Sequence, residues 1–347
     1  MTAPDLPDPA ERTGPPRSAA ATSQHLLPLW LGVGDRDPDG RHNLVTVRQA
    51  LNLTETVTVT VSGRSGTAEV TGVVITGRRS GHDDARAVAV TAVSAVTAVV
   101  ERYRRLAPLA DIPRIHLDIV RGAPVTGTVT GADAADAAAA LVATRELLHG
   151  AGAAGAGYAL APRPTDAELR ELAASLGAEV PAHLIGGTVL ETGLAGAPPD
   201  TVPVMARGVR HWALALDPRP LPCPEVFDRL DAQRDAAARG ERPDVRAGDV
   251  TAVQRSLLTA NPTELAGLLA NDLQPAALSL RPPLRRTLTA AREAGALGTV
   301  VVGPGPAVAM LCSDREHAVE VATAVSVAGH TGPTLVAASS PHGARTA

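Results

Sequence analysis

The chain has 347 residues, of which 45% are hydrophobic, and its formal net charge is −4. A chain of this length buries a sizeable core in one large or two ordinary domains, and its composition excludes wholesale disorder. The weakly acidic balance and the absence of a basic block argue against nucleic acid as a partner. No apolar run approaches membrane-spanning length, so we expect no association with a membrane.

The first 23 residues are charged and rich in Pro and Ala, which predicts a disordered tail and neither a signal peptide nor an anchor. Only two cysteines occur, Cys223 and Cys312, and they are far apart, so we expect a reducing cytoplasm as the location. The chain has no lysine and a single phenylalanine, Phe227. Any chemistry at its sites must therefore proceed without a lysine side chain.

The first half of the chain predicts strands mixed with two long helices. Residues 25–34 predict a strand, and residues 54–76 alternate apolar and polar residues on both sides of a Gly/Ser turn, which is typical of a β-hairpin. We expect an apolar helix over 83–106, a strand over 114–120 and an Ala-rich helix over 136–148.

The second half begins with a helix after Thr165, whose side chain is expected to form a capping box with Glu168. A strand is predicted over 210–216, followed by three or four helices between residues 224 and 295. The last predicted elements are two strands, a helix and a final strand: 299–302, 307–312, 314–327 and 333–339. This order predicts an α+β protein with two α/β layers and a cleft between its halves.

The stretch "RGAPVTGTVTGADAADAAAALVATRELL" (121–148) has the outline of a glycine-rich loop leading into a helix, which binds phosphate through backbone N–H groups. It is short of glycines, and Asp133 stands where a phosphate would lie. A carboxylate 4 Å from a phosphate charge costs about 4 kcal/mol at an effective dielectric of 20. A bridging Mg²⁺ would reverse that sign. Two interpretations stay open: Asp133 as a metal ligand, or as a helix cap without a ligand.

Five segments resemble one enzyme family in their order and spacing. From about residue 25 to 345 the chain resembles the 4-diphosphocytidyl-2-C-methyl-D-erythritol kinases of the GHMP superfamily. The segments are "GVGDRDPDGRHNLVTVRQALNL" (32–53), "LGAEVPAHLIGGTVLETG" (176–193), "HWALALDPRPLPCPEVFDRLD" (211–231), "NDLQPAALSLRPPLRRTL" (271–288) and "EAGALGTVVVGPGPAVAMLC" (293–312).

The resemblance implies a GHMP kinase fold with a cleft between two domains. After the tail over 1–23, it implies a ribosomal-protein-S5-like ATP-loop domain over 24–160 and a ferredoxin-like domain over 161–347. It also implies an enzyme of non-mevalonate isoprenoid biosynthesis. Such an enzyme transfers the γ-phosphate of ATP, with Mg²⁺, to the 2-hydroxyl of a small cytidine diphosphate ester.

The family's ATP loop resembles P-x-G-G-G-x-G-G-G-S/A, and Pro124, Gly127 and Gly131 match it here. Glycine matters in such a loop because it permits positive φ and close backbone approach. The resemblance implies that ATP binds at Pro124, Val125, Thr126, Gly127, Thr128, Val129, Thr130, Gly131, Ala132, Asp133 and Ala134.

The residues that would handle catalysis differ from the family's pattern. The family's P-A-K-x-N-L places its catalytic lysine at Leu26 and its asparagine at Pro28. The catalytic carboxylate of G-A/S-D-V-P falls on Glu179 in "GAEVP", one methylene longer. Glu179 could act as a general base, or it could be an ordinary helix-end carboxylate.

The resemblance implies three substrate-binding residues. "GRH" stands for the family's G-Y-H, so His42 would read the cytosine edge while Arg41 stacks on the base through its guanidinium plane. Phe227 stands at the family's second cytosine platform, although a lone aromatic is usually part of a core. No residue is assigned to a metal, and no protein partner is identified.

Three functions therefore stay open. The first is a kinase that acts on the cytidine diphosphate ester. The second is a non-catalytic paralogue, which would bind a nucleotide or metabolite or regulate a true kinase. The third is a phosphotransferase with a changed substrate and mechanism.

Overall fold

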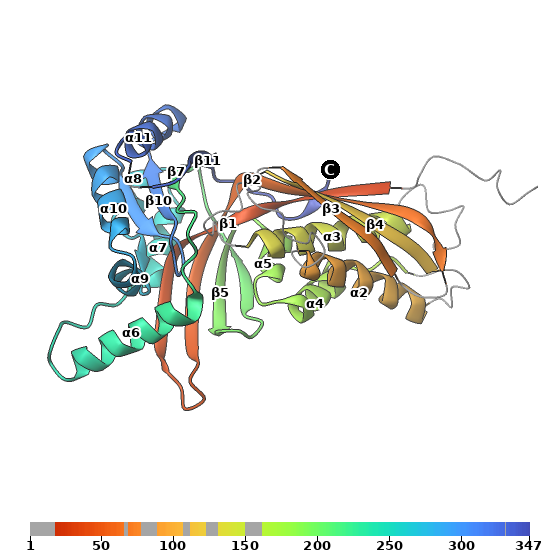
Figure 1. Ribbon diagram of the computed structural model, residues 1–347, viewed down its shortest axis with the longest axis horizontal. Coiled ribbons are helices and arrows are strands. Elements are labelled where there is room, and N and C mark those ends of the chain that lie inside the picture. The colour runs from red at the N-terminus through yellow and green to blue at the C-terminus, as the bar shows by residue number, and fades with distance from the viewer. Residues whose placement is uncertain are drawn as a thin grey trace, which may run out of the picture.

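The computed structural model describes residues 18–65, 69–77, 89–106, 112–122, 131–149, 162–329 and 331–347. Two β-sheets with helices packed on them confirm the predicted α+β class (Figure 1). The strands are β1 (Ser18–Arg36), β2 (His42–Ser65), β3 (Glu69–Gly77), β4 (Ile112–Arg121), β5 (Thr188–Leu194), β6 (Asp200–Val204), β7 (His211–Ala215), β8 (Ala270–Asn271), β9 (Gly298–Val301), β10 (Val308–Cys312), β11 (Thr334–Ala338) and β12 (Arg345–Thr346).

The helices fall into two groups along the chain. The first group is α2 (Val90–Leu106), α3 (Ala132–His149), α4 (Asp166–Leu176) and α5 (Val180–Ile185). The second group is α6 (Cys223–Ala238), α7 (Val250–Leu257), α8 (Pro262–Ala266), α9 (Gln274–Leu280), α10 (Pro283–Glu293) and α11 (Arg315–Val327). In the described part of the chain, no helix is both long enough and apolar enough to cross a bilayer.

The larger sheet has eight strands, with the order β12-β1-β2-β4-β3 along its main path. β5 pairs with the first part of β2 and β6 pairs with β5, while β8 runs parallel to β1. Helices α2, α3, α4 and α5 gather along one side of this sheet (Figure 1). Residues 137–140, all alanine, are completely buried on α3, and their small side chains let the helix lie close to β1 and β2.

The predicted hairpin over 54–76 is wrong. β2 and β3 both form, but β4 lies between them, antiparallel to β2 and parallel to β3. Alternation identifies a strand with one buried face, yet it does not say which strand lies beside it. Val57 and Val59 on β2 instead share a core with Ile115 and Leu117 on β4.

The smaller sheet has the antiparallel order β11-β7-β10-β9. One face packs against α6, α9, α10 and α11, and the other packs against α7, α8 and residues 27–30 and 47–51 of the β1–β2 pair. Leu27 and Leu29 of β1 belong to the same core as Trp212 of β7. The long β1–β2 pair therefore belongs to both halves of the molecule, as Figure 1 shows.

Several boundaries differ from the sequence predictions. β1 begins at Ser18, so residues 18–23, assigned to the tail, form strand pairs with β2 and β12. Five helices lie between residues 223 and 293, where three or four were expected, and β5 and β6 were not predicted. Because β5 pairs with β2 and α4 packs on the first core, the division of the chain at residue 160 stays a prediction. The capping box of Thr165 and Glu168 is confirmed.

Candidate functional site

Glu179 lies at the N-terminus of α5, directly after the turn that ends α4. Pro181 in the first turn of α5 supplies no N–H, which suits a helix start, and Val180 and Pro181 are buried. The Glu179 side chain remains 40% exposed. The local sequence thus anchors the backbone of this turn and leaves its carboxylate accessible.

The start of α3 faces this carboxylate. Gly131, the residue before α3, has φ +94°, and a Cβ there would lie 2.5 Å from Nε2 of His183 and 3.6 Å from Oε2 of Glu179. Only glycine fits both the backbone conformation and the space. Gly131 is the part of the predicted ATP loop that the structure brings against Glu179. Residues 124–130 of that loop lie outside the described residues.

An arginine that the sequence did not single out, Arg48, joins two carboxylates here. Its Nη2 lies 2.9 Å from Oε1 of Glu179, and its Nε lies 2.8 Å from Oε2 of Glu191. The second contact is an ion pair without hydrogen-bond alignment, since Nε and both Glu191 oxygens have no hydrogen-bond partner among the described residues. Arg48 lowers the pKa of Glu179, whereas burial raises that of Glu191.

His183 closes the site from α5. Its Nδ1 donates to the carbonyl oxygen of Gln24 on β1 at 2.8 Å, so Nε2 of the neutral ring is the acceptor that faces Gly131. Burial lowers the pKa of His183 to about 4, and the nearby carboxylate of Glu179 only partly offsets this effect. The ring is therefore neutral at physiological pH and carries no positive charge that could compensate the carboxylate of Glu179.

Asp133 is held by an arginine. Arg121, at the end of β4, donates from Nη2 to Asp133 at 2.9 Å and to Asp136 at 2.5 Å. Its guanidinium is completely buried, and Asp133 itself is 64% exposed. The negative charge of Asp133 at the start of α3 is thus compensated by Arg121. Within the described ranges, no cluster of three or more His, Cys, Asp or Glu side chains could hold a metal ion.

Leu26, at the position expected for a catalytic lysine, is buried. It packs with Ala50, Ala182 and Val189 in a small apolar cluster. His25 beside it is bonded to Glu55, with 2.5 Å between Nε2 and Oε1, and both side chains are buried. Neither residue presents a cation to Glu179.

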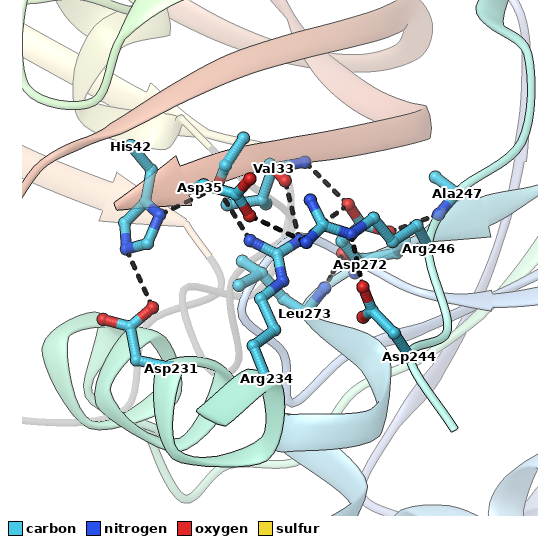
Figure 2. Close-up of polar contacts among 12 residues, drawn as sticks. Val33, Asp35, His42, Asp231, Arg234, Asp244, Arg246, Ala247, Asp272 and Leu273 are labelled. Carbon is cyan, nitrogen blue, oxygen red and sulfur yellow. Dashed lines mark hydrogen bonds and ion pairs between the residues drawn. The ribbon is translucent and has the colours of Figure 1, made fainter. Parts of the chain in front are cut away.

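Two of the three predicted substrate-binding residues meet at the other end of the site. The rings of His42 and Phe227 are 5.2 Å apart between centroids. Nδ1 of His42 donates to the carbonyl oxygen of Gly34 at 3.0 Å, and Nε2 lies 3.3 Å from Oδ1 of Asp231 (Figure 2). The guanidinium of Arg41 instead contacts Asp39 in the β1–β2 turn, and the structure does not bring it to this ring pair.

Helix α6 presents one face to this end of the site, because Phe227, Asp231 and Arg234 are spaced by four and three residues. Arg234 donates to the carbonyl oxygens of Gly34 and Val33, each at 2.7 Å, and to Asp272. Figure 2 shows Asp272 at the centre of this network, where it also accepts from the backbone N–H groups of Val33 and Ala247. Asp272 is therefore structural and fixes the strand end next to His42.

The turn "GPGPA" (303–307) and the end of β9 before it are likewise fixed by the last residue of β8 and the first residue of α9. Asn271 donates to the carbonyl oxygens of Val301 and Gly303, at 2.8 and 2.6 Å, and the side-chain carbonyl of Gln274 accepts from the N–H of Val301. These contacts give Asn271 and Gln274 structural roles.

A cavity of about 180 Å³ lies beside Glu179. Arg48, Glu179 and Glu191 line it together with residues 193–197, and the N–H of Ala195 donates to the carbonyl oxygen of His42. Cys223, one turn before Phe227 on α6, lies close enough for Glu179 to raise its pKa further, although burial is the larger cause. The backbone bond between Ala195 and His42 and the effect of Glu179 on Cys223 thus place the His42–Phe227 pair in the neighbourhood of Glu179.

Comparison with known proteins agrees with this architecture. The family model described as GHMP kinases C terminal matches residues 253–331. The 4-diphosphocytidyl-2-C-methyl-D-erythritol kinase of Corynebacterium jeikeium is 42% identical over 93% of this chain and 92% of its own length. The kinase of the same name from Saccharopolyspora erythraea is 41% identical over 91% of this chain and 90% of its own.

Solved structures share the fold. A crystal structure of 4-(cytidine 5'-diphospho)-2C-methyl-D-erythritol kinase has a TM-score of 0.61 at 21% identity, covering 93% of this chain and 98% of that one. L. major mevalonate kinase in complex with R-mevalonate has a TM-score of 0.64 at 13% identity, covering 95% and 97%. The expected GHMP kinase fold is confirmed.

Proposed function

The chain belongs to the 4-diphosphocytidyl-2-C-methyl-D-erythritol kinase family, and we propose that it transfers the γ-phosphate of ATP to the 2-hydroxyl of the cytidine diphosphate ester. The observation that carries this proposal is the approach of Glu179 to Gly131 at the start of α3. A carboxylate beside a phosphate-binding helix start is the arrangement that phosphoryl transfer needs, since the reaction depends on positioning and on charge compensation.

Each group has a part in the transfer. The backbone N–H groups at the start of α3 bind the phosphates of ATP, and Arg121 offsets the charge of Asp133 there. Asp133 and Glu179 would be the carboxylates available to a Mg²⁺ ion bound by the phosphates of ATP, and such an ion would supply further charge compensation. His42 and Phe227 bind the cytosine. Glu179 accepts the proton of the 2-hydroxyl as that oxygen attacks the γ-phosphorus and the β–γ bridging bond breaks.

The decisive experiment is a calorimetric titration with Mg-ATP followed by a coupled assay with the cytidine diphosphate ester. We expect binding and turnover for the wild type. Glu179→Gln keeps the size of the side chain but cannot accept a proton, so we expect kcat to fall by about 10²- to 10⁴-fold with ATP binding retained. Equal kcat values for the two proteins would show that Glu179 is not the base.

A second candidate is a non-catalytic paralogue that binds nucleotide. Leu26 favours it, because its side chain fills apolar space where the family pattern expects a lysine. Binding of Mg-ATP without any turnover of the ester would support this candidate against the kinase.

A further inference from the structure

The Glu179 carboxylate has one ion-pair partner in the described part of the chain, and this partner is Arg48. The guanidinium is not a chance surface contact. The Arg48 side chain is 15% exposed, and Glu191, which is 3% exposed, contacts its Nε. A surface ion pair orients little, whereas a buried guanidinium fixed by a second carboxylate has one preferred place.

The strand register explains how Arg48 reaches this place. Arg48 on β2 lies opposite Pro28 on β1, and Ala50, two residues later, lies opposite Leu26. Residues opposite one another on paired strands share a sheet face, as do residues two apart on one strand. Arg48 therefore projects from the same face as Leu26, one strand further across the sheet.

We propose that Arg48 is the positioning residue of the transfer site: with Glu191 against its Nε, it holds the Glu179 carboxylate toward the start of α3. This inference rests on the proposed role of Glu179 as the proton acceptor. Glutamate carries one more methylene than aspartate, and a long acidic side chain needs a lateral contact to stay in one place. Arg48 provides that contact and puts a positive charge next to the reacting groups, in a chain without lysine.

The groups facing Glu179 come from four elements: Arg48 on β2, Glu191 on β5, His183 on α5 and Cys223 at the start of α6. Arg48 is the largest cause of the lowered pKa of Glu179, and His183 contributes less. Without Arg48, the pKa of Glu179 rises, and the carboxylate is protonated at a pH where the wild type still accepts a proton.

The test compares Arg48→Met with Arg145→Met. Arg145 is a matched control, because it is 13% exposed, contacts the two carboxylates Asp166 and Glu146, and lies on α3 away from Glu179. We expect R48M to lower kcat about 100-fold with little change in KM for ATP, and R145M to stay within about twofold of the wild type. Lysine restores the charge but not the double contact, so R48K should recover about tenfold of the loss.

The pH profile adds a readout that a purely structural role would not move. The acid limb of the pH profile of kcat should shift to higher pH in R48M and should not shift in R145M. A kcat for R48M within about threefold of that for R145M, with an unshifted limb, overturns the proposal. If R48M does not fold, Glu191→Gln is the second variant: a fall in kcat of about fivefold at constant KM for ATP supports the proposal, and no change overturns it.

A measurement without turnover separates this proposal from the proposed function. The ¹³C resonance of the Glu179 carboxyl should titrate at higher pH in R48M than in the wild type and R145M. If R48M shows that shift and the wild type makes no product, kinase activity is refuted but the contact between Arg48 and Glu179 is upheld. Product from the wild type and an unchanged titration in R48M uphold the kinase and refute the role of Arg48.

Discussion

The two ends of the site are held by different kinds of interaction. At the His42 end, most contacts are to backbone groups: His42 and Arg234 both donate to the carbonyl oxygen of Gly34, and Asp272 accepts from two backbone N–H groups besides Arg234. At the Glu179 end, Arg48 instead forms ion pairs with two carboxylates, the buried Glu191 and the partly exposed Glu179.

The difference predicts how each end responds to substitution. Loss of a side-chain hydrogen bond to a backbone carbonyl costs about 1–3 kcal/mol when the carbonyl is left without a partner. Removing one member of a buried ion pair leaves an uncompensated charge, which costs more. The Glu179 end should therefore be sensitive to single substitutions and to pH. Substitutions at the His42 end should chiefly change the affinity for the substrate.

The largest loss of stability is expected at the ion pair of Arg121 with Asp136 on α3. Arg121→Met leaves Asp136 buried without its partner, and such losses cost about 3–5 kcal/mol of unfolding free energy. Burial already raises the pKa of Asp136 to about 7, and Arg121 opposes this rise. Asp136 thus stabilises the fold in its protonated form, and that stability is lost as pH rises through about 7. Urea unfolding should show a larger deficit for R121M at pH 8.5 than at pH 6. A deficit no larger than that of R145M would contradict this account.

The second effect concerns His183. Its pKa falls from 6.5 to about 4 on folding, so the stability it contributes is present above pH 6.5 and is lost as pH falls toward 4. Between pH 7.5 and 5 the loss is about 2 kcal/mol. His183→Asn keeps a donor for the carbonyl of Gln24 but does not titrate. The fall in unfolding free energy between these two pH values should be smaller in H183N by that amount, and identical pH dependence would show that the ring is not buried as described.

A substitution of Phe227 tests the His42 end of the site. Base–aromatic stacking is worth about 1–3 kcal/mol, so Phe227→Ala should raise KM for the cytidine diphosphate ester roughly 10- to 100-fold. KM for ATP should stay constant, because Phe227 lies beside His42 and not at α3. Phe227→Leu, which keeps much of the volume without the ring, separates stacking from packing. If F227L matched the wild type, Phe227 would be a core residue only.

The smallest effect tests the length of the acidic side chain. Glu179→Asp restores the residue of the family pattern but withdraws the carboxylate from Arg48 by about one bond length. We expect kcat to fall about five- to tenfold in steady-state assays, since small displacements are costly in phosphoryl transfer. A rise in kcat would mean that Arg48 does not position this carboxylate.

The local patterns of the sequence predicted most elements correctly, because burial of one face leaves a periodic signature. The Ala run of α3, the capping box at Thr165 and the alternation of β2 all appear in the structure. Strand partners were not predictable in this way, and the hairpin over 54–76 failed for that reason.

The site shows the same limit. Glu179, His42 and Phe227 stand within recognisable motifs, whereas Arg48 belongs to none of them and lies in a stretch for which no strand was predicted. Its partner Glu191 is more than 140 residues away and belongs to a strand that was not predicted. Only the pairing of β2 with β5 brings the two side chains together, and no local signal encodes that pairing.

We propose above all that this chain transfers a phosphoryl group with Glu179 as the general base. The most direct measurement is ³¹P NMR of the protein with Mg-ATP and the cytidine diphosphate ester. We expect one new phosphomonoester for each ATP consumed, formed at least about 100-fold more slowly by E179Q. A folded wild-type protein that binds both ligands and forms no phosphomonoester would contradict this proposal.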